Sequence, residues 1–538
     1  MLEPTTETPR PPRTGELIRP LRDEADAISV RVSRPKSARP KPAGWLAYLV
    51  LIILTLASYA PIFKSDLHWS EYDQVERSPY QSMETWKQAW ALGIIRSEDP
   101  ITLSSYFLEQ ALPLRPVIAH HAINLLLHAL AAVLLLKTLD ALKLPAAFSA
   151  SLVFALHPAV LQTIFWSGFR SELIGLVLLL GALFFGVRNR NARDFACLIA
   201  ISALAFCLHP ATLVLPLILT LCVFYQSKSS HLRNYNHLLP LFCLSLFIGV
   251  WTQVNQSGQN FLFGERISIY AQNLFFYFKQ ALLPLDLALF HPFNYEGGHN
   301  LGAQNSLLPF LLFLPPYVLF AINFRKSWAR GLLLGLTAYL LLSIYSISSN
   351  GAFIDGKLAH EDHLLYIGLP VIVAVVVCSF GAIARTMGSS GRILWFLGFT
   401  AFALFQFILT ASYAYRVSDA EQLWHDISQQ WPDAWLPKLA LIHTIQDSGS
   451  ESELLNQSEI IELLEDILSQ QPDLIEERQL LARIYLKDRQ NTNALREYRR
   501  ILRDSKPDND FLREAADFYD SLGLNWDANN VRERITQK

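Results

Sequence analysis

The sequence is poor in charge, cysteine and methionine. Charged residues make up 17% of its 538 positions and apolar residues 51%, with five cysteines and three methionines. All five cysteines lie inside apolar runs without a Cys-x-x-Cys pair, which predicts small buried residues and not disulfides or metal ligands. The net charge of −2 offers no basic excess for nucleic acid. A GxxxxGK[ST] nucleotide motif is also absent.

The few charges are unevenly distributed. Residues 1–44 contain 15 charged residues, residues 413–538 contain 39, and the 368 residues between them contain only 38. This division predicts a polar tail, a hydrophobic membrane unit and a charged C-terminal unit, and it excludes a soluble enzyme and a wholly disordered chain. The tail, 1–44, has eight prolines and no sustained apolar period, so we expect it to be disordered and cytoplasmic.

The hydrophobic unit, residues 45–412, contains apolar runs long enough to cross a membrane. We expect an all-α domain of eleven transmembrane helices. The 33-residue run 195–227 counts as two of them, because Pro210 interrupts it. The eleven runs lie at about 41–64, 115–137, 143–170, 172–188, 195–209, 210–227, 237–252, 305–324, 331–349, 364–384 and 393–412.

Positive charges predict the orientation of these spans. Five basic residues and no acidic ones occupy 31–41, so the N-terminus should be cytoplasmic. Alternate short loops contain 12 basic residues against 4 in the opposite loops, provided that 267–290 does not cross. We therefore expect 267–290 to be an interfacial or re-entrant helix on the outer side, and the C-terminal unit to lie outside the cytoplasm. Short loops and the lack of organelle-targeting signals favour a bacterial inner membrane.

The C-terminal unit, residues 413–538, is rich in helix-forming residues and repeats a Pro-Asp pair at Pro432, Pro472 and Pro507. The last interval is 35 residues, close to the period of about 34 of tetratricopeptide (TPR) repeats. Residues at the TPR packing offsets are small or apolar, namely Ala482, Tyr485, Ala494, Tyr498 and Ile501. We expect a TPR-like α-solenoid that binds a partner or an extended chain, with an acidic helical bundle as the alternative.

Polar residues within or beside the spans are candidate site residues, because they are costly in lipid. Arg170 and Glu172 lie at a membrane boundary, where Arg170 is able to bind phosphate or simply to snorkel. His121, Asn124 and His128 share one face of the second span through their i, i+3, i+7 spacing. Hydrogen bonding between spans is the alternative role for these three residues.

Two acidic residues in the outer loop, 64–115, follow the first span closely. Glu71 and Asp73 are placed where a carboxylate can serve as general base toward a hydroxyl acceptor. Asp73 also follows Ser70 by three residues, a pattern that caps helices, and either acid has the alternative role of a solvated loop carboxylate. The segment HEDH at 360–363 offers metal ligands by type, but its spacing fits no standard site, so we expect no metal.

In their order and spacing, these residues resemble the transmembrane-and-TPR O-mannosyltransferases, which are multispan glycosyltransferases of the C superfamily (GT-C). The family shows a His-x-x-Asn-x-x-x-His pattern, then His-Pro before Arg-x-acid, then an acid before Leu-Leu-Tyr. A His stands here where the last pattern has Arg. The matching positions in this chain are His121, Asn124, His128, His157, Pro158, Arg170, Glu172, Asp362 and His363. The resemblance extends over about 65–510.

The resemblance implies transfer of a sugar, often mannose, from a polyprenyl-phosphate carrier to protein hydroxyls outside the cytoplasm. It places Glu71 as the base, Arg170 at the phosphate and the other matching positions around the substrate. No cofactor is implied beyond the lipid-linked donor, and a need for a divalent metal is left open. The implied partners are the membrane lipid, that donor, and a protein bound by the TPR unit.

One departure from the family pattern keeps a second interpretation open. The family carries two adjacent acids after a Trp in the outer loop, where this chain has Ser70 and Glu71. This difference favours the alternative of a non-catalytic membrane scaffold that binds partner proteins through its TPR repeats. A transporter or lipid flippase is a further alternative. It is disfavoured because charges within the membrane are few and no inverted repeat is visible.

Overall fold

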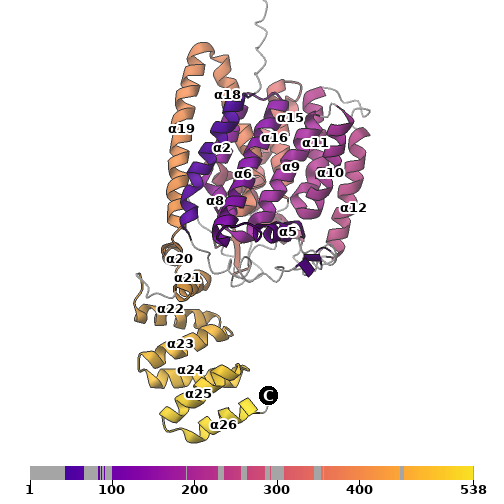
Figure 1. The fold of residues 1–538 in the computed structure, drawn as a ribbon. Coiled ribbons are helices and arrows are strands. Elements are labelled where there is room, and N and C mark those ends of the chain that lie inside the picture. The colour runs from indigo at the N-terminus through magenta and orange to yellow at the C-terminus, as the bar shows by residue number, and fades with distance from the viewer. Residues whose placement is uncertain are drawn as a thin grey trace, which may run out of the picture. The chain divides into compact units, whose positions relative to one another are not determined.

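The structure, a computed structural model, is built almost entirely from helices (Figure 1). Its exception is one small sheet, which the all-α prediction did not include. The predicted tail up to residue 42 and the two predicted candidates for the base, Glu71 and Asp73, lie outside the described residues. The structure describes 43–538 except 66–82, 85, 88–89, 91–99, 189–190, 228–235, 256–262, 285–286, 288–290, 293–307, 345–352, 355–356, 361, 449–453 and 537–538.

Each of the eleven predicted apolar runs contains a helix. Among the described residues, five helices are long and apolar enough to cross a membrane, or six when one bent pair counts as a single span, and four more apolar helices are shorter. The chain is therefore an integral membrane protein. The helices are α2 (Trp45–Tyr59), α6 (Pro116–Ala141), α7 (Ala147–Ala155), α8 (Leu161–Phe165), α9 (Arg170–Arg188), α10 (Ala192–Leu208), α11 (Leu215–Ser227), α12 (Leu239–Asn255), α15 (Leu308–Ile322), α16 (Ser327–Ser343), α18 (Leu369–Thr386) and α19 (Gly388–Val417).

The bent pair is α7 and α8, which meet at 52° around His157 and Pro158. Proline has no N–H and interrupts the helical hydrogen bonds, so nearby carbonyls need other donors inside a membrane. The Thr410 hydroxyl donates to the Leu156 carbonyl at 2.6 Å, and the Tyr59 hydroxyl donates to the His157 carbonyl at 2.9 Å. Side chains from α19 and α2 thus stabilise the break.

The predicted break at His209 and Pro210 is confirmed. Helix α10 ends one residue earlier, His209 is extended, and Pro210 begins the short 3-10 helix η5 (Pro210–Val214) that leads into α11. The Thr212 hydroxyl donates to the Ala205 carbonyl at 2.7 Å and so satisfies one acceptor at the end of α10. The irregular backbone is buried in protein, which is where a membrane fold tolerates it.

The ambiguous stretch 267–290 forms α13 (Phe263–Leu282), which ends before Pro284. It packs on α15, α16 and α18. Beyond it lies the small antiparallel sheet, in the order β1 (His291–Pro292), β3 (Lys357–His360) and β2 (Phe353–Ile354). The sheet pairs His291 with His360 and so joins two segments about 70 positions apart in sequence. Whether α13 is interfacial stays a prediction.

The C-terminal unit is a series of antiparallel helix pairs. The three Pro-Asp turns lie between α20 and α21, between α22 and α23, and between α24 and α25. All five residues at the predicted packing offsets are buried, which confirms that they form the core of this unit. The helices are α20 (Ala420–Gln430), α21 (Trp435–Ser448), α22 (Gln457–Gln470), α23 (Ile475–Lys487), α24 (Asn491–Asp504), α25 (Asn509–Ser521) and α26 (Asn525–Thr536).

The first helix of that unit belongs to the hydrophobic core of the membrane unit. Leu423, Trp424 and Ile427 of α20 are buried in the same cluster as the spans. The Trp424 ring packs edge-on against Trp166, with ring centroids 6.0 Å apart. The predicted boundary at 412/413 also falls inside α19. Helix α20 is therefore a structural part of the membrane unit.

Replacing Trp424 by alanine should destabilise the protein. The side chain is 4% exposed, and truncating a buried Trp costs about 3–5 kcal/mol of unfolding free energy. The matched control is Trp526→Ala, because Trp526 is 76% exposed and its loss should change stability by no more than about 0.5 kcal/mol. Thermal unfolding in detergent measures both. Equal shifts would show that the contact with Trp166 is not a packed interface.

Candidate functional site

Arg170, the first residue of α9, is fully buried among polar groups of α5 (Pro100–Glu109) and α6. Its Nη1 lies 2.5 Å from Glu109 Oε2. Its Nη2 lies 2.6 Å from His120 Nδ1, and its Nε donates to Asn124 Oδ1 at 2.7 Å. We call these four residues the Arg170 cluster. A buried arginine needs such partners because an unpaired charge in an apolar interior is strongly destabilising.

Two more side chains of α5 contact the same guanidinium. The guanidinium carbon lies 4.4 Å from the centre of the Tyr106 ring, a cation–π contact, and Nη1 is 3.4 Å from the Ser105 hydroxyl. Burial raises the pKa of Glu109, but its hydrogen bond with His120 and the positive charge of Arg170 outweigh burial and bring that pKa below its usual value. Glu109 is therefore an anion at neutral pH.

Figure 1 shows why these groups meet. Helix α5 lies across one end of the helix bundle, where α6 and α9 begin, and it contacts both of them. His120 and Asn124 are one helical turn apart on α6 and present their side chains to the same neighbour. The Asn124 amide also donates to the Ile164 carbonyl of α8 at 2.9 Å. Four helices therefore converge on Asn124 and Arg170.

The predicted face of His121, Asn124 and His128 is entirely buried, but its three members have separate partners. His121 Nε2 lies 3.1 Å from the Ser65 hydroxyl at the end of the first span. His128 Nε2 donates to the Ala155 carbonyl at 3.1 Å, so its Nδ1 accepts from the Tyr366 hydroxyl at 3.0 Å. These two histidines link helices, the alternative role for this face, and Asn124 alone reaches Arg170.

A second buried group surrounds Glu172, one position beyond Ser171. Glu172 Oε1 lies 3.6 Å from His209 Nε2 and 3.7 Å from His363 Nε2, and the Ser171 hydroxyl donates to Oε2 at 2.7 Å. We call these four residues the Glu172 cluster. His209 Nδ1 accepts the Ala211 backbone N–H at 3.2 Å, so a neutral His209 carries its proton on Nε2, facing Glu172.

His363 is held by stacking and by its backbone. Its ring stacks on Phe169 at 3.8 Å between centroids, and its backbone N–H donates to Gln162 Oε1 at 2.6 Å. Asp362, the adjacent residue, is also buried. Both residues lie in the short helix η7 (Asp362–Leu365), which the sequence places almost 200 positions from Glu172.

His157, also predicted as a site residue, makes a structural contact. Its Nε2 donates to the Ala281 carbonyl of α13 at 3.1 Å, and its own carbonyl accepts from Tyr59. It thus holds α13 against the break between α7 and α8. A direct role toward a substrate stays a prediction for this residue.

Four residues of these clusters are not among the predicted site residues, namely Glu109, His120, Ser171 and His209. Glu109 and Arg115 are the only charged residues between positions 100 and 136, and that isolation within apolar sequence was the available signal. His120 precedes the predicted His121 directly, and His209 was considered only as a helix break. Within the part of the chain that the structure describes, no three His, Cys, Asp or Glu side chains are arranged to hold a metal ion.

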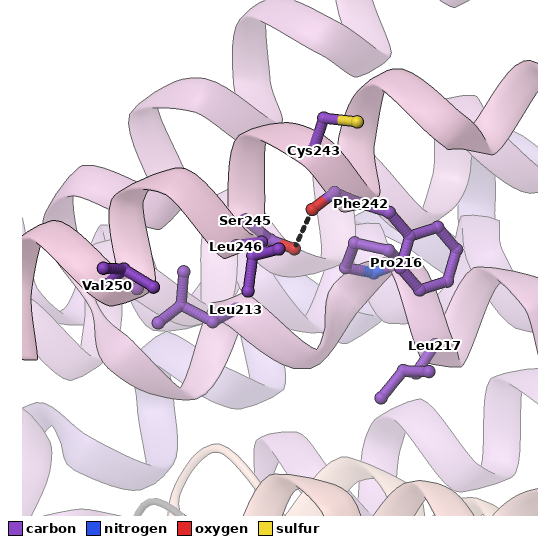
Figure 2. A pocket seen from close by; sticks show the side chains of 9 residues that line it. Leu213, Pro216, Leu217, Phe242, Cys243, Ser245, Leu246 and Val250 are labelled. Carbon is purple, nitrogen blue, oxygen red and sulfur yellow. Dashed lines mark hydrogen bonds between the residues drawn. The ribbon is translucent and has the colours of Figure 1, made fainter.

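An apolar groove of about 770 Å³ opens between η5, α11 and α12. Figure 2 shows its mostly apolar lining, which includes the ring of Phe242, and the hydroxyl of Ser245 donates to the Phe242 carbonyl at 3.1 Å. The groove begins at Leu213, about one turn after His209 of the Glu172 cluster. Its lining residues are Leu213, Pro216, Leu217, Phe242, Cys243, Ser245, Leu246, Gly249 and Val250.

Comparison with known proteins gives one informative relative. The chain matches no protein-family model. In an alignment of 218 positions that covers 37% of this chain, it is 23% identical to Protein O-mannosyl-transferase F38B6.6 of Caenorhabditis elegans. The match spans 31% of that relative, about a third of its length. This similarity confirms the resemblance to O-mannosyltransferases that the motifs predict.

A solved structure gives a weaker likeness. The archaeal oligosaccharyltransferase AglB from Archaeoglobus fulgidus, in complex with an inhibitory peptide and a dolichol-phosphate, aligns with a TM-score of 0.35 and 15% identity. The alignment covers 71% of this chain and 57% of that one. A TM-score of this size is too low to support a function.

Replacing Arg170 by glutamine should destabilise the bundle strongly. The change leaves Glu109 as a buried, unpaired carboxylate, and breaking a buried pair costs about 3–5 kcal/mol. The control is Arg499→Gln, because Arg499 is 57% exposed and lies 3.7 Å from Asp527, itself 33% exposed, a pair worth about 1 kcal/mol or less. Thermal unfolding of the two variants in detergent distinguishes them. Similar melting temperatures would mean that the Arg170 cluster contributes little to stability.

Proposed function

We propose that this protein is a membrane glycosyltransferase that moves a sugar, with mannose favoured, from a polyprenyl-phosphate carrier to hydroxyl groups of proteins outside the cytoplasm. The observation that carries the proposal is the similarity to a protein O-mannosyl-transferase. The Arg170 and Glu172 clusters support it, because they gather buried charge at one place in an apolar bundle, and such charge is more often functional than structural.

The proposed chemistry needs a general base, a residue that binds the phosphate, and a site that excludes water. Glu71 takes the hydroxyl proton as the acceptor oxygen attacks the sugar carbon, and Asp73 is the second candidate for that role. The bond from sugar to phosphate breaks, and the departing polyprenyl phosphate is stabilised by Arg170. The positions of the base and of Arg170 are fixed by the histidines and carboxylates of the two clusters, together with His121, His128, His157 and Asp362.

The groove between α11 and α12 suits the apolar part of such a donor. Its lining is apolar, and it starts about one turn from the Glu172 cluster. A prenyl chain lying there has its phosphate end near the polar residues and gains the burial that an apolar groove offers. This placement supports a lipid-linked donor over a soluble nucleotide sugar.

The helix pairs of the C-terminal unit support its proposed identity as a TPR-like solenoid. Their turns recur at Pro432, Pro472 and Pro507, and the interior positions of the repeat are buried. Solenoids of stacked helix pairs present extended surfaces to polypeptides. We assign this unit the binding of the acceptor protein or of a partner protein.

Replacing Glu71 by glutamine should lower sugar transfer by about 10²–10⁴-fold, the usual loss when a positioned general base is removed. Glutamine is nearly isosteric, so expression should be unchanged. Asp73→Asn should cost less. The measurement is transfer of labelled sugar from a polyprenyl-phosphate donor to a peptide, with glycan mass spectrometry of exported proteins. If Asp73→Asn is the inactive variant, the base is Asp73. If the wild type transfers no sugar and neither variant changes a glycan, the scaffold interpretation is correct.

The eleven-span topology predicts that the C-terminal unit is exported. A cysteine at the exposed position Asp488 should react with a membrane-impermeant maleimide in intact cells, since it lies in that unit. A cysteine at the exposed Arg325, between α15 and α16, is the control and should react only after the membrane is permeabilised. Labelling of position 488 only after permeabilisation would contradict the predicted number of spans.

A further inference from the structure

Glu109 is a buried carboxylate in the segment between the first two predicted spans. It is the last residue of α5, it is buried, and its neighbours from Gln110 to Pro116 are all exposed. Among the described residues it is the one carboxylate within ion-pair distance of Arg170. Glu109 therefore adds one negative charge to the Arg170 cluster, and it does so from α5, a helix that is not one of the spans.

Several side chains of α5 contact the bundle at Arg170. Three of its side chains, those of Ser105, Tyr106 and Glu109, contact the Arg170 guanidinium. Tyr106 also stacks on His120 at 6.0 Å between ring centroids. A change at Arg170 consequently acts on several contacts that hold α5 in place.

A guanidinium binds carboxylate and phosphate oxygens in the same geometry. Arg170 Nη1 lies 2.5 Å from Glu109 Oε2 and His120 Nδ1 lies 3.4 Å from Glu109 Oε1, so these two side chains form a site for one oxyanion, and Glu109 occupies it. An incoming phosphate can replace Glu109 without leaving the buried arginine unpaired. The released carboxylate would be solvated at the exposed segment that follows it, which avoids a second buried charge.

We propose that Glu109 is an internal substitute for the phosphate of a polyprenyl-phosphate lipid, and that binding of this phosphate to Arg170 displaces Glu109 and releases α5 from the bundle. The proposal rests on the proposed function for the identity of the lipid. It gives Glu109 a positioning role: it orients Arg170 and shields it from water when no donor is bound, and it competes with the donor phosphate for the same N–H groups.

Hydrogen exchange of the wild-type protein in detergent tests the displacement directly. Polyprenyl phosphate should make the amides of α5 exchange about tenfold faster, the factor that corresponds to about 1.4 kcal/mol of closing free energy. Polyprenol of the same chain length lacks the phosphate and should leave α5 unchanged. Unchanged or slower exchange of α5 with polyprenyl phosphate would overturn the proposal. A response to inorganic phosphate but not to the lipid would overturn the lipid as the occupant.

The variant E109Q tests the competition. Glutamine keeps the size of the side chain and removes its charge, so polyprenyl phosphate should bind about tenfold or more tightly than to the wild type. The gain should disappear in the double variant E109Q/R170Q. The control D140N removes a carboxylate that accepts the Ala43 backbone N–H and should leave phosphate binding unchanged. Equal binding by E109Q and wild type, or a gain that survives R170Q, would show that Glu109 is only a structural ion-pair partner.

These experiments separate the proposal from the proposed function, because neither one measures sugar transfer. Transfer activity without movement of α5 would keep the function and overturn the role of Glu109. Movement of α5 without any transfer would keep that role and overturn the function. If E109Q does not fold, the exchange experiment on the wild type decides alone.

Discussion

The pairing of Arg170 with Glu109 is the constraint on which the end of the bundle beside α5 depends. A guanidinium inside an apolar helix bundle is tolerated only when an anion and several acceptors surround it. Those partners come from α5 and α6, and Arg170 itself begins α9, so neutralising one charge fixes the relative positions of three helices. The same pairing explains why α5, a helix outside the spans, lies against the bundle.

Broken helices bring the second set of polar groups to this region. The chain contains three His-Pro pairs: those beginning at His157 and His209 mark breaks between helices, and the one beginning at His291 forms the strand β1. Proline ends the helical ladder, and the preceding histidine supplies ring nitrogens that bond nearby groups. His157 fastens α13, and His209 faces Glu172. Irregular backbone in a membrane protein is thereby placed where its polar atoms have partners.

Helix α20 of the C-terminal unit packs against the membrane unit close to the Arg170 cluster. Trp424 of α20 packs against Trp166, and Trp166 stands four residues before Arg170. Phe169, in the same short segment, stacks on His363. The segment that leads into α9 is therefore held from one side by α20 and from the other by η7. Ring contacts therefore connect both α20 and η7 to the short segment that precedes Arg170.

The sequence by itself determined the helical class, the apolar runs, the break at Pro210 and the buried repeat positions from Ala482 to Ile501. These features depend on local periodicity and on the missing N–H of proline, which are properties of neighbouring residues. It also singled out Arg170 and Glu172, because charge in apolar sequence is costly wherever it lies.

Only the tertiary structure decided which groups these charges meet. Glu109, His120 and Asn124 approach Arg170 from positions about 45 to 60 residues away, and His209 and His363 approach Glu172 from positions about 40 and 190 residues away. Such pairings depend on how helices cross and bend, which no short sequence pattern specifies. For the same reason the sequence placed His121, Asn124 and His128 on one face, while packing gave each of them a different partner.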